Sequence, residues 1–518
     1  MFAGTVDGCL LGSFVVYLMA MLFIGFLFSG KMTTLGDYYL GGRRMNKWVV
    51  ALSAQASDMS GWLLMGLPGA VFVSGFSEAW IGIGLGIGTY LNWKIVAHRL
   101  RVYSRICKDS ITIPDFISNR FRDTTGVARL VAALIILVFF TFYTASGFVS
   151  CAKLFSSTFG MNYQVALWIG AVVVVSYTLL GGYMAVCWTD FIQGSLMFIA
   201  IVLVPAIVIG NAGGFAATVD QLNAISPNLQ NLFTSAQTGR ACGFIGLVSC
   251  MAWGLGYFGM PHILVRFMSI DNPAEVKGSR RIAMAWVFVS LGAAVVIGLV
   301  GHLFLKQQGL TLEQVGGDPE KIFMIMVNGL FSKGFLARIF AGILLSAIMA
   351  AIMSTSDSQL LVSASAFSND LYKVVLRKRA TDRELVSVSR LAVAAVAVIA
   401  AILASNDQSG FFKVVMKMVS FAWGGFGASF GSLILLALFW KRVNLAGAVA
   451  GMVTGATTCF VWKFVLAERF AASCPIFGLY ELAPGFILAM VVTIIVSLVT
   501  PAPSREILDE FEAVDKAC

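Results

Sequence analysis

Apolar residues dominate the chain in long runs, most of them close to 20 residues or longer. A helix needs about 20 mainly apolar residues to cross the hydrocarbon core of a bilayer, so each run predicts one membrane-spanning helix. Strands of a membrane barrel would instead alternate over segments of about 10 residues, which the sequence does not show. The pattern therefore predicts an all-α polytopic membrane protein with thirteen transmembrane helices. They are expected at 9–29, 47–73, 78–98, 128–156, 163–183, 190–210, 243–266, 281–305, 336–364, 387–405, 413–440, 443–465 and 481–500.

Composition supports this class. Of 518 residues, 58% are hydrophobic and only 12% are charged. Soluble domains carry about 25% charged residues, so the apolar surplus must face membrane lipid. The 36 Lys and Arg residues outnumber the 26 Asp and Glu residues, but they stand in short tracts between the apolar runs. Such tracts orient a membrane protein, and we expect no nucleic-acid partner.

The basic tracts also predict the orientation. They follow the first, third, seventh, ninth and eleventh spans, whereas the stretch 211–242 holds only Arg240. Because positively charged connections remain in the cytoplasm, we expect the N-terminus outside and the C-terminus in the cytoplasm. The chain before 9–29 has no basic region of the kind that opens a cleaved signal peptide. We expect one integral domain over 1–518, with a cytoplasmic tail at 501–518.

The second span carries polar residues at a depth where they are costly. Within 51–62 it places Asp58 among Ser57, Ser60 and Gly61. Ionisable residues inside a membrane mark ion or substrate sites by default. Serine and glycine also allow close helix packing, so a polar seam between helices is the alternative. Packing does not need an acidic residue, which favours a functional site.

The seventh span contains Gly254, Gly256, Gly259 and Pro261 within one apolar run. Both residue types interrupt helices. A simple proline kink is the alternative, but backbone groups released in a membrane must find partners or line a cavity. The two interrupted spans lie five spans apart, which is the spacing expected of an inverted repeat whose broken helices meet near the middle of the membrane.

Two more places combine polar groups with apolar surroundings. Over 351–359, the ninth span carries a hydroxyl cluster in which Ser354 and Ser358 share a helical face and Asp357 lies one turn from Ser354. A single hydroxyl often bonds back to its own helix, but the density of polar residues favours a site. Asp190 opens the sixth span, where a carboxylate either attracts a cation or anchors the helix at the membrane surface.

Residue types that carry enzymatic or metal chemistry are scattered. The three histidines and nine cysteines form no group with metal-ligand spacing. We therefore expect no enzymatic activity, no organic cofactor and no obligatory protein partner.

Five stretches in separate spans and connections are similar to known proteins, and through them the chain resembles the sodium/solute symporter family over nearly its whole length. The resemblance implies a five-plus-five inverted repeat like that of the leucine transporters, with repeat one at about 47–210 and repeat two at about 243–440. Two further spans follow, at 443–465 and 481–500. The stretches are ALSAQASDMSGWLLMGLPGAVF from Ala51, ITIPDFISNRF from Ile111, WGLGYFGMPHILVRFM from Trp253, AGILLSAIMAAIMST from Ala341 and GLYELAPGFI from Gly478.

The resemblance further implies Na⁺ as the co-transported ion, in a bacterial cytoplasmic (inner) membrane. Its ligands would be the backbone carbonyls of Ala56, Met59 and Ala351 and the hydroxyls of Ser354 and Thr355. Na⁺ favours oxygen ligands, and an unwound helix exposes carbonyls that have lost their partners. Residues implied on the sodium pathway or in coupling are Asp58, Asp190, Ser57, Arg43 and Asp357. One family member that carries proline has a hydroxyl residue where this chain has Asp357, which leaves an extra ion or proton site open here.

The substrate implied by the resemblance is L-proline, taken up by alternating access. Its carboxylate suits the N–H groups of a half-helix, its ammonium suits carbonyl or hydroxyl oxygens, and its ring suits aromatic faces. A sodium-coupled symporter of another small organic solute and a transport-like membrane sensor are the alternatives. The implied substrate residues are Ser60, Gly61, Trp62, Tyr143, Trp253, Tyr257 and Pro261.

Overall fold

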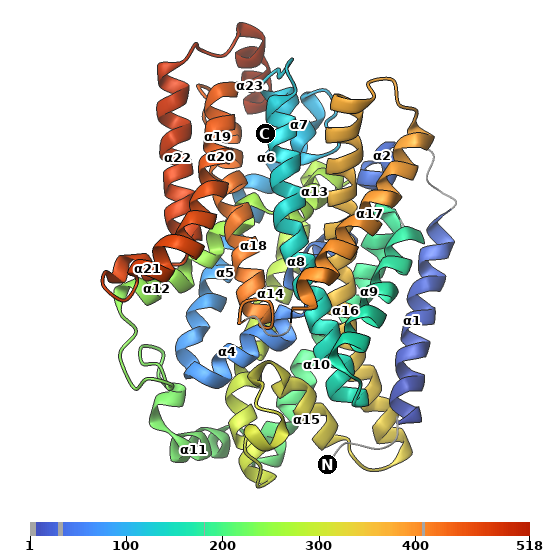
Figure 1. Ribbon diagram of the computed structural model, residues 1–518, viewed down its shortest axis with the longest axis vertical. Coiled ribbons are helices and arrows are strands. Elements are labelled where there is room, and N and C mark those ends of the chain that lie inside the picture. The colour runs from blue at the N-terminus through green and yellow to red at the C-terminus, as the bar shows by residue number, and fades with distance from the viewer. Residues whose placement is uncertain (1–6, 30–34, 181, 407–409) are drawn as a thin grey trace.

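The structure is a computed structural model that describes residues 7–29, 35–180, 182–406 and 410–518, and within these ranges the regular elements are helices (Figure 1). Two isolated bridges, Met45 with Ile270 and Thr234 with Ala241, are the β-type pairings among the same residues. The all-α prediction is confirmed. The α-helices are α1 (Gly8–Ser29), α2 (Leu35–Leu40), α3 (Lys47–Met59), α4 (Leu67–Ser74), α5 (Ala79–Leu91), α6 (Ala97–Ile106), α7 (Ile113–Arg120), α8 (Val127–Phe159), α9 (Tyr163–Leu180), α10 (Tyr183–Asn211), α11 (Phe215–Ile225), α12 (Phe244–Ala252), α13 (Pro261–Ser269), α14 (Val276–Gln307), α15 (Ile322–Leu330), α16 (Phe335–Ser365), α17 (Asp382–Ala404), α18 (Val415–Phe426), α19 (Ser432–Phe439), α20 (Leu445–Val461), α21 (Glu468–Phe470), α22 (Leu482–Val499) and α23 (Arg505–Ala517).

When the helices of the described chain are counted as spans by their length and apolar character, there are fewer than predicted. Ten helical segments of the described chain are long and apolar enough to cross a membrane, and eleven if the bent pair Phe244–Gly259 and Pro261–Ser269 is one span. The count of thirteen is therefore not confirmed. The apolar part of α9, Tyr163–Leu179, is short, and Trp62–Ile106 runs on as one helical segment. The predicted span 163–183 also crosses residue 181, which lies outside the described ranges.

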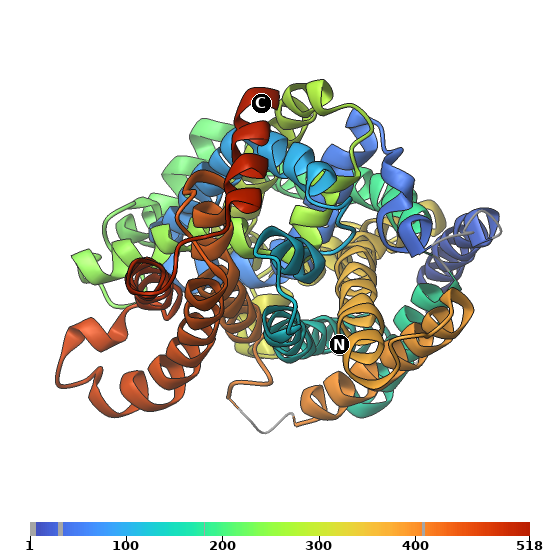
Figure 2. The same ribbon diagram turned by 90° about the horizontal axis from the view of Figure 1, so that it is seen from above.

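The ends of the described chain lie at opposite ends of the molecule. Figure 1 shows α1 beginning at the end that carries α11 and α15, whereas α2, α6, α7 and the C-terminal α23 gather at the other end. Seen along the long axis, α1 and the α20–α22 group occupy opposite edges, with α8 and α16 between them (Figure 2). A chain whose two ends lie at opposite ends of the molecule runs along its long axis an odd number of times, as the prediction requires.

The second predicted span is broken where its polar residues lie. Asn46 caps the start of α3, since its side-chain oxygen accepts hydrogen bonds of 3.0 Å from the backbone N–H groups of Trp48 and Val49. The helix ends at Met59. Ser60 then takes a φ of 49°, a left-handed value that an L residue rarely adopts, and its hydroxyl accepts a bond of 3.1 Å from the N–H of Trp62. Helical structure resumes beyond this point.

The seventh predicted span is broken as well. After α12 the chain tightens into a 3₁₀ turn over Trp253–Gly259, becomes extended at Met260, and re-enters a helix at Pro261. The two halves are bent by 47°. Pro261 has no N–H to lose at the first helical turn, which is why the second half begins there.

Close packing of the break in the seventh span depends on glycine. A Cβ on Gly256 would lie 1.9 Å from Nε1 of Trp423, a distance that real carbon atoms do not reach. The indole of Trp423 is itself fixed, since Nε1 donates a hydrogen bond of 2.7 Å to the carbonyl of Trp253. The absence of a side chain at Gly256 therefore lets α18 approach the broken helix.

We predict that Gly256→Ala destabilises the protein, because the added methyl group must displace Trp423 from its hydrogen bond. Overpacking of this kind costs about 1–3 kcal/mol. Thermal unfolding of the purified protein in detergent should show a lower Tm. Gly246→Ala is the matched control, since Gly246 also lies on the α12 side of the break and has nothing within 4 Å of the added carbon. Equal Tm values for the two variants would contradict the packing argument.

Candidate functional site

The broken end of α3 faces the hydroxyl cluster of α16. The Ser354 hydroxyl lies 2.8 Å from the carbonyl oxygen of Ala56 and 3.2 Å from that of Ala351, and the Thr355 hydroxyl lies 3.4 Å from Ala56. All four residues are buried. Met59 is the last residue of α3, at the end where helix carbonyls lose their intrahelical partners. The structure thus brings together oxygen atoms of the kind that hard cations prefer.

Asp190 of α10 lies beside this oxygen cluster. Its Oδ2 accepts hydrogen bonds from the hydroxyls of Ser53 at 2.6 Å and Ser57 at 2.9 Å, and from Nη2 of Arg266 at 3.0 Å. The same Nη2 donates to the Ser358 hydroxyl at 2.5 Å. Arg266 is 1% exposed, so its charge and that of Asp190 form a buried ion pair. Sequence reasoning did not single out Arg266, because nothing in its local sequence shows which carboxylate it meets.

Asp357 adds a second buried carboxylate next to this pair. One oxygen, Oδ1, accepts a bond of 3.3 Å from the Ser358 hydroxyl. The other, Oδ2, has no hydrogen-bond partner among the described residues, and neither has Oδ1 of Asp190. Buried polar atoms are almost always paired, so two orphaned carboxylate oxygens in one cluster call for an explanation. Each of these oxygens is free to accept from a donor or to bind a cation.

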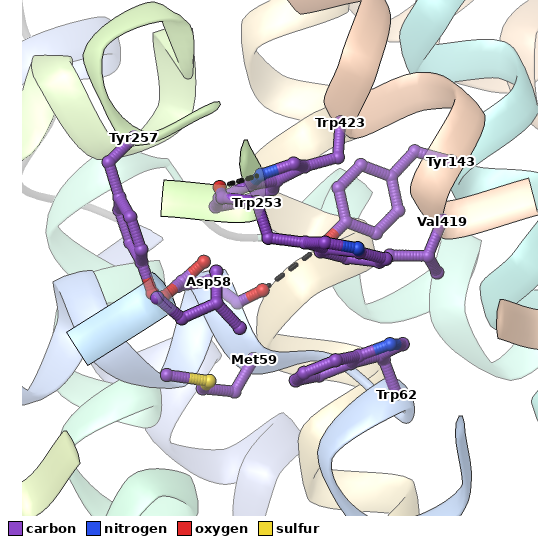
Figure 3. Close-up of a pocket in the computed structure, with 9 residues that line it drawn as sticks. Asp58, Met59, Trp62, Tyr143, Trp253, Tyr257, Val419 and Trp423 are labelled. Carbon is purple, nitrogen blue, oxygen red and sulfur yellow. Dashed lines mark hydrogen bonds between the residues drawn. The ribbon is translucent and has the colours of Figure 1, made fainter. Parts of the chain in front are cut away.

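An aromatic pocket lies beside the α3 break, and Figure 3 shows Tyr257 reaching toward Asp58 with the tryptophan rings stacked to one side. The Tyr257 hydroxyl donates to Oδ2 of Asp58 at 2.6 Å, and the Tyr143 hydroxyl donates to the Asp58 backbone carbonyl at 3.2 Å. The rings of Trp62 and Trp253 stack with 5.4 Å between centroids. The lining residues are Asp58, Met59, Trp62, Leu85, Tyr143, Trp253, Tyr257, Val419 and Trp423.

The pocket is closed in this structure. Its free volume is about 10 Å³, which is roughly the space that one water molecule needs. The stacked rings of Trp62 and Trp253 fill the centre (Figure 3). A solute as large as an amino acid therefore fits only after the aromatic side chains separate.

Four of the predicted substrate residues line the cavity, and three belong to the breaks themselves. Ser60 and Pro261 shape the two interruptions. Gly61 lies against α8, where a Cβ would come within 2.9 Å of the Ser150 hydroxyl. Sequence reasoning missed the lining residues Leu85, Val419 and Trp423. One feature of the sequence could have identified Trp423. It stands directly before two glycines on a late span, and a bulky ring next to residues that allow close helix approach indicates a tight contact between helices.

Arg43 lies apart from these clusters, before α3. Its guanidinium donates to the carbonyls of Met268 at 2.6 Å and Ser110 at 2.8 Å, and pairs with Asp109 at 3.0 Å. Burial lowers the pKa of the guanidinium, and the Asp109 carboxylate opposes that shift. The contacts fasten the chain before α3 to the end of α13, so Arg43 connects the two broken segments at one end of the molecule.

The comparisons with known proteins agree on a transport family. A model of the sodium:solute symporter family matches residues 38–455. The chain is 48% identical over 491 residues to a high-affinity proline transporter of Bacillus subtilis, covering 95% of this chain and 98% of the relative. It is 45% identical over 506 residues to the sodium/proline symporter of Escherichia coli, covering 98% and 96%. These relatives are transporters and not enzymes.

Solved structures carry the same fold at low identity. A substrate-bound, outward-open Na⁺-coupled sialic acid symporter superposes with a TM-score of 0.76 at 19% identity, covering 96% of this chain and all of that one. MhsT, solved in complex with L-phenylalanine, superposes with a TM-score of 0.53 at 12% identity, covering 88% of this chain and 98% of that one. The fold is thus the leucine-transporter type. Together with the match over residues 38–455, the relatives place this multi-pass membrane protein in the sodium:solute symporter family.

Proposed function

We propose that this chain takes up L-proline by secondary active symport with Na⁺, through alternating access. The printed names of relatives at 45–48% identity support the substrate. The observation that carries the proposal is the α3 break. A few consecutive residues there supply both oxygen atoms suited to a cation and part of the wall of the aromatic pocket. Ala56 faces α16 and Asp58 faces the pocket, with one residue between them.

Sodium is proposed to bind between α3 and α16. The carbonyls of Ala56, Met59 and Ala351 and the hydroxyls of Ser354 and Thr355 would hold the ion. The bond between Ser354 and Ala56 in the present structure shows that the two helices already meet through these oxygens. An ion held there would bridge the same helices with charge–dipole contacts, which are stronger than one neutral hydrogen bond.

Proline is proposed to bind in the aromatic pocket, with Ser60, Gly61 and Pro261 shaping the helix ends around it. Its carboxylate would meet N–H groups where a half-helix begins after a break. Its ammonium would meet the hydroxyls of Tyr143 and Tyr257 or the Asp58 backbone carbonyl to which Tyr143 now donates. Its ring would lie between Trp62 and Trp253. The closed cavity means that this binding requires the rings to separate.

The two sites are coupled because they share the α3 break. An ion that fixes Ala56 and Met59 also fixes Asp58 between them, and the reverse holds by thermodynamic linkage. L-Proline has no net charge at neutral pH, so transport with one Na⁺ moves one positive charge inward. The membrane potential would contribute about 2.3 kcal/mol per 100 mV to each such cycle.

The other predicted residues are proposed to serve the ion's route and the coupling. Asp190 and Asp357 carry the two orphaned carboxylate oxygens, and the Ser57 hydroxyl donates to the other carboxylate oxygen of Asp190. Arg43 joins the broken segments at the end that carries α23. We also propose that this end is cytoplasmic, that the N-terminus is outside in a bacterial inner membrane, and that the repeats cover about 47–210 and 243–440.

The proposed function predicts that purified protein in liposomes accumulates labelled L-proline only with an inward Na⁺ gradient. An inside-negative potential should raise the uptake, because net charge moves inward. A K⁺ gradient of equal size is the control. A panel of unlabelled solutes then tests the substrate, and proline should compete best. Uptake that is indifferent to external Na⁺ would refute the coupling.

We predict that Thr355→Ala raises the Na⁺ concentration for half-maximal uptake by about tenfold, since one oxygen ligand is lost and ~1.4 kcal/mol corresponds to that factor. Thr355→Ser retains the hydroxyl and should stay near the wild-type value. At saturating Na⁺ the KM for proline should change less than about twofold. Unchanged Na⁺ dependence in Thr355→Ala would reject the assignment.

For Asp190, a double substitution separates a sodium role from simple neutralisation of Arg266. Asp190→Asn leaves a buried guanidinium without its carboxylate, which is strongly destabilising. Asp190→Asn combined with Arg266→Gln restores the charge balance. If Asp190 lies on the sodium route, the double variant should be more stable than either single variant, because neither charge of the pair is left alone, yet it should need about tenfold more Na⁺ for half-maximal uptake. Wild-type Na⁺ activation in the double variant would assign Asp190 to the ion pair alone.

A further inference from the structure

The loop between α20 and α22 reaches the aromatic pocket, although both helices lie outside the proposed repeats. Tyr480 stands in this loop, two residues before α22 begins. Its ring stacks on Trp253, with 5.4 Å between centroids and 27° between planes. Trp253 in turn stacks on Trp62, with 5.4 Å and 29°. Three rings therefore form a continuous run from the peripheral helices into the centre of the pocket.

Tyr480 is held at both ends by the elements that wall the pocket. Its hydroxyl donates a hydrogen bond of 2.5 Å to the carbonyl of Ser420 on α18. Its backbone N–H donates a bond of 3.0 Å to the hydroxyl of Ser249 on α12. A Cβ on Gly424 would lie 3.5 Å from the Tyr480 hydroxyl oxygen, an ordinary van der Waals distance, so the Tyr480 ring packs directly along α18. The ring is thus fixed before it meets Trp253.

Trp253 needs such support because of where it lies. It is the first residue of the 3₁₀ turn Trp253–Gly259, where three glycines provide no side chains to pack against its indole. Two rings from later in the chain supply the packing instead: Tyr480 of the loop before α22, and Trp423 of α18 at 6.5 Å with 28° between planes. Figure 3 shows Trp253 lying between Trp62 and Trp423. A ring held in this way sets how far Trp62 and Trp253 can separate.

We infer that Tyr480 is a positioning residue for the substrate pocket, holding the Trp253 ring so that the space between Trp253 and Trp62 admits a small, flat solute. The inference rests on the proposed function and extends it to a residue outside the repeats. Tyr480 does not line the cavity and acts through Trp253. Its expected effect is on substrate affinity and on the size of solute accepted, not on the ion.

The test measures Na⁺-driven uptake of labelled L-proline in liposomes for the wild type, Tyr480→Ala and Tyr480→Phe. Tyr480→Ala should raise KM by about two- to tenfold, the range expected for one aromatic pair, and leave Vmax within about twofold. Competition by pipecolate, the six-membered-ring homologue of proline, should become relatively stronger. Tyr480→Phe keeps the ring and should stay near wild type in both measurements.

Phe477→Ala is the matched control, because Phe477 lies in the same loop and packs on Trp462 and Phe470 instead of Trp253. It should leave the KM and the pipecolate competition unchanged. If Tyr480→Ala is not recovered from membranes, Tyr480→Leu replaces it, since leucine fills the space without a flat ring. Wild-type values in the Tyr480 variant, or the same change in Phe477→Ala, would overturn the inference. Absence of sodium-driven proline uptake by the wild type would instead refute the proposed function, and the inference with it.

Discussion

No bulk water reaches a peptide group in the hydrocarbon core, so every backbone oxygen released there must find a partner inside the protein. α3 ends at Met59 in such surroundings, and Ser60 adopts a strained φ of 49° to end it. The Ser354 hydroxyl of α16 donates to the carbonyl of Ala56, one turn before that end. The contact between α3 and α16 therefore exists because the helix is broken. Both proposed binding sites are built around it.

Charge in this region is only partly compensated. Arg266 satisfies one oxygen of Asp190, and Asp357 brings a further carboxylate that the same guanidinium does not neutralise. Removing charges from water costs several kcal/mol per ion, so a buried pair is a poor source of stability. A cluster with two acidic side chains and one basic side chain has the composition that the proposed sodium route requires. This reading agrees with a sodium-coupled family.

The aromatic pocket differs from the charged cluster, because its own lining side chains leave almost no free space inside it. Trp62, Trp253 and Trp423 pack so closely that about 10 Å³ of the pocket is left free. A pocket packed this closely by its own side chains leaves room for about one water molecule. Such closure also keeps Asp58 dry and bonded to Tyr257. Opening it must separate rings that are supported from α18 and from the loop before α22, which places part of the substrate control outside the repeats.

The sequence by itself determined the helical membrane class, the two breaks and the polar residues of the site, because each is a local property. An apolar run of about 20 residues, a Gly- and Pro-rich interruption, or Asp58 among serines is visible without knowing any neighbour. Only the tertiary structure decided that Arg266 pairs with Asp190, that Trp423 occupies the space left by Gly256, and that Tyr480 supports Trp253. The partners in these contacts stand 76, 167 and 227 residues apart in the chain. Chain folding sets such distances, and no local pattern of apolar and polar residues encodes them.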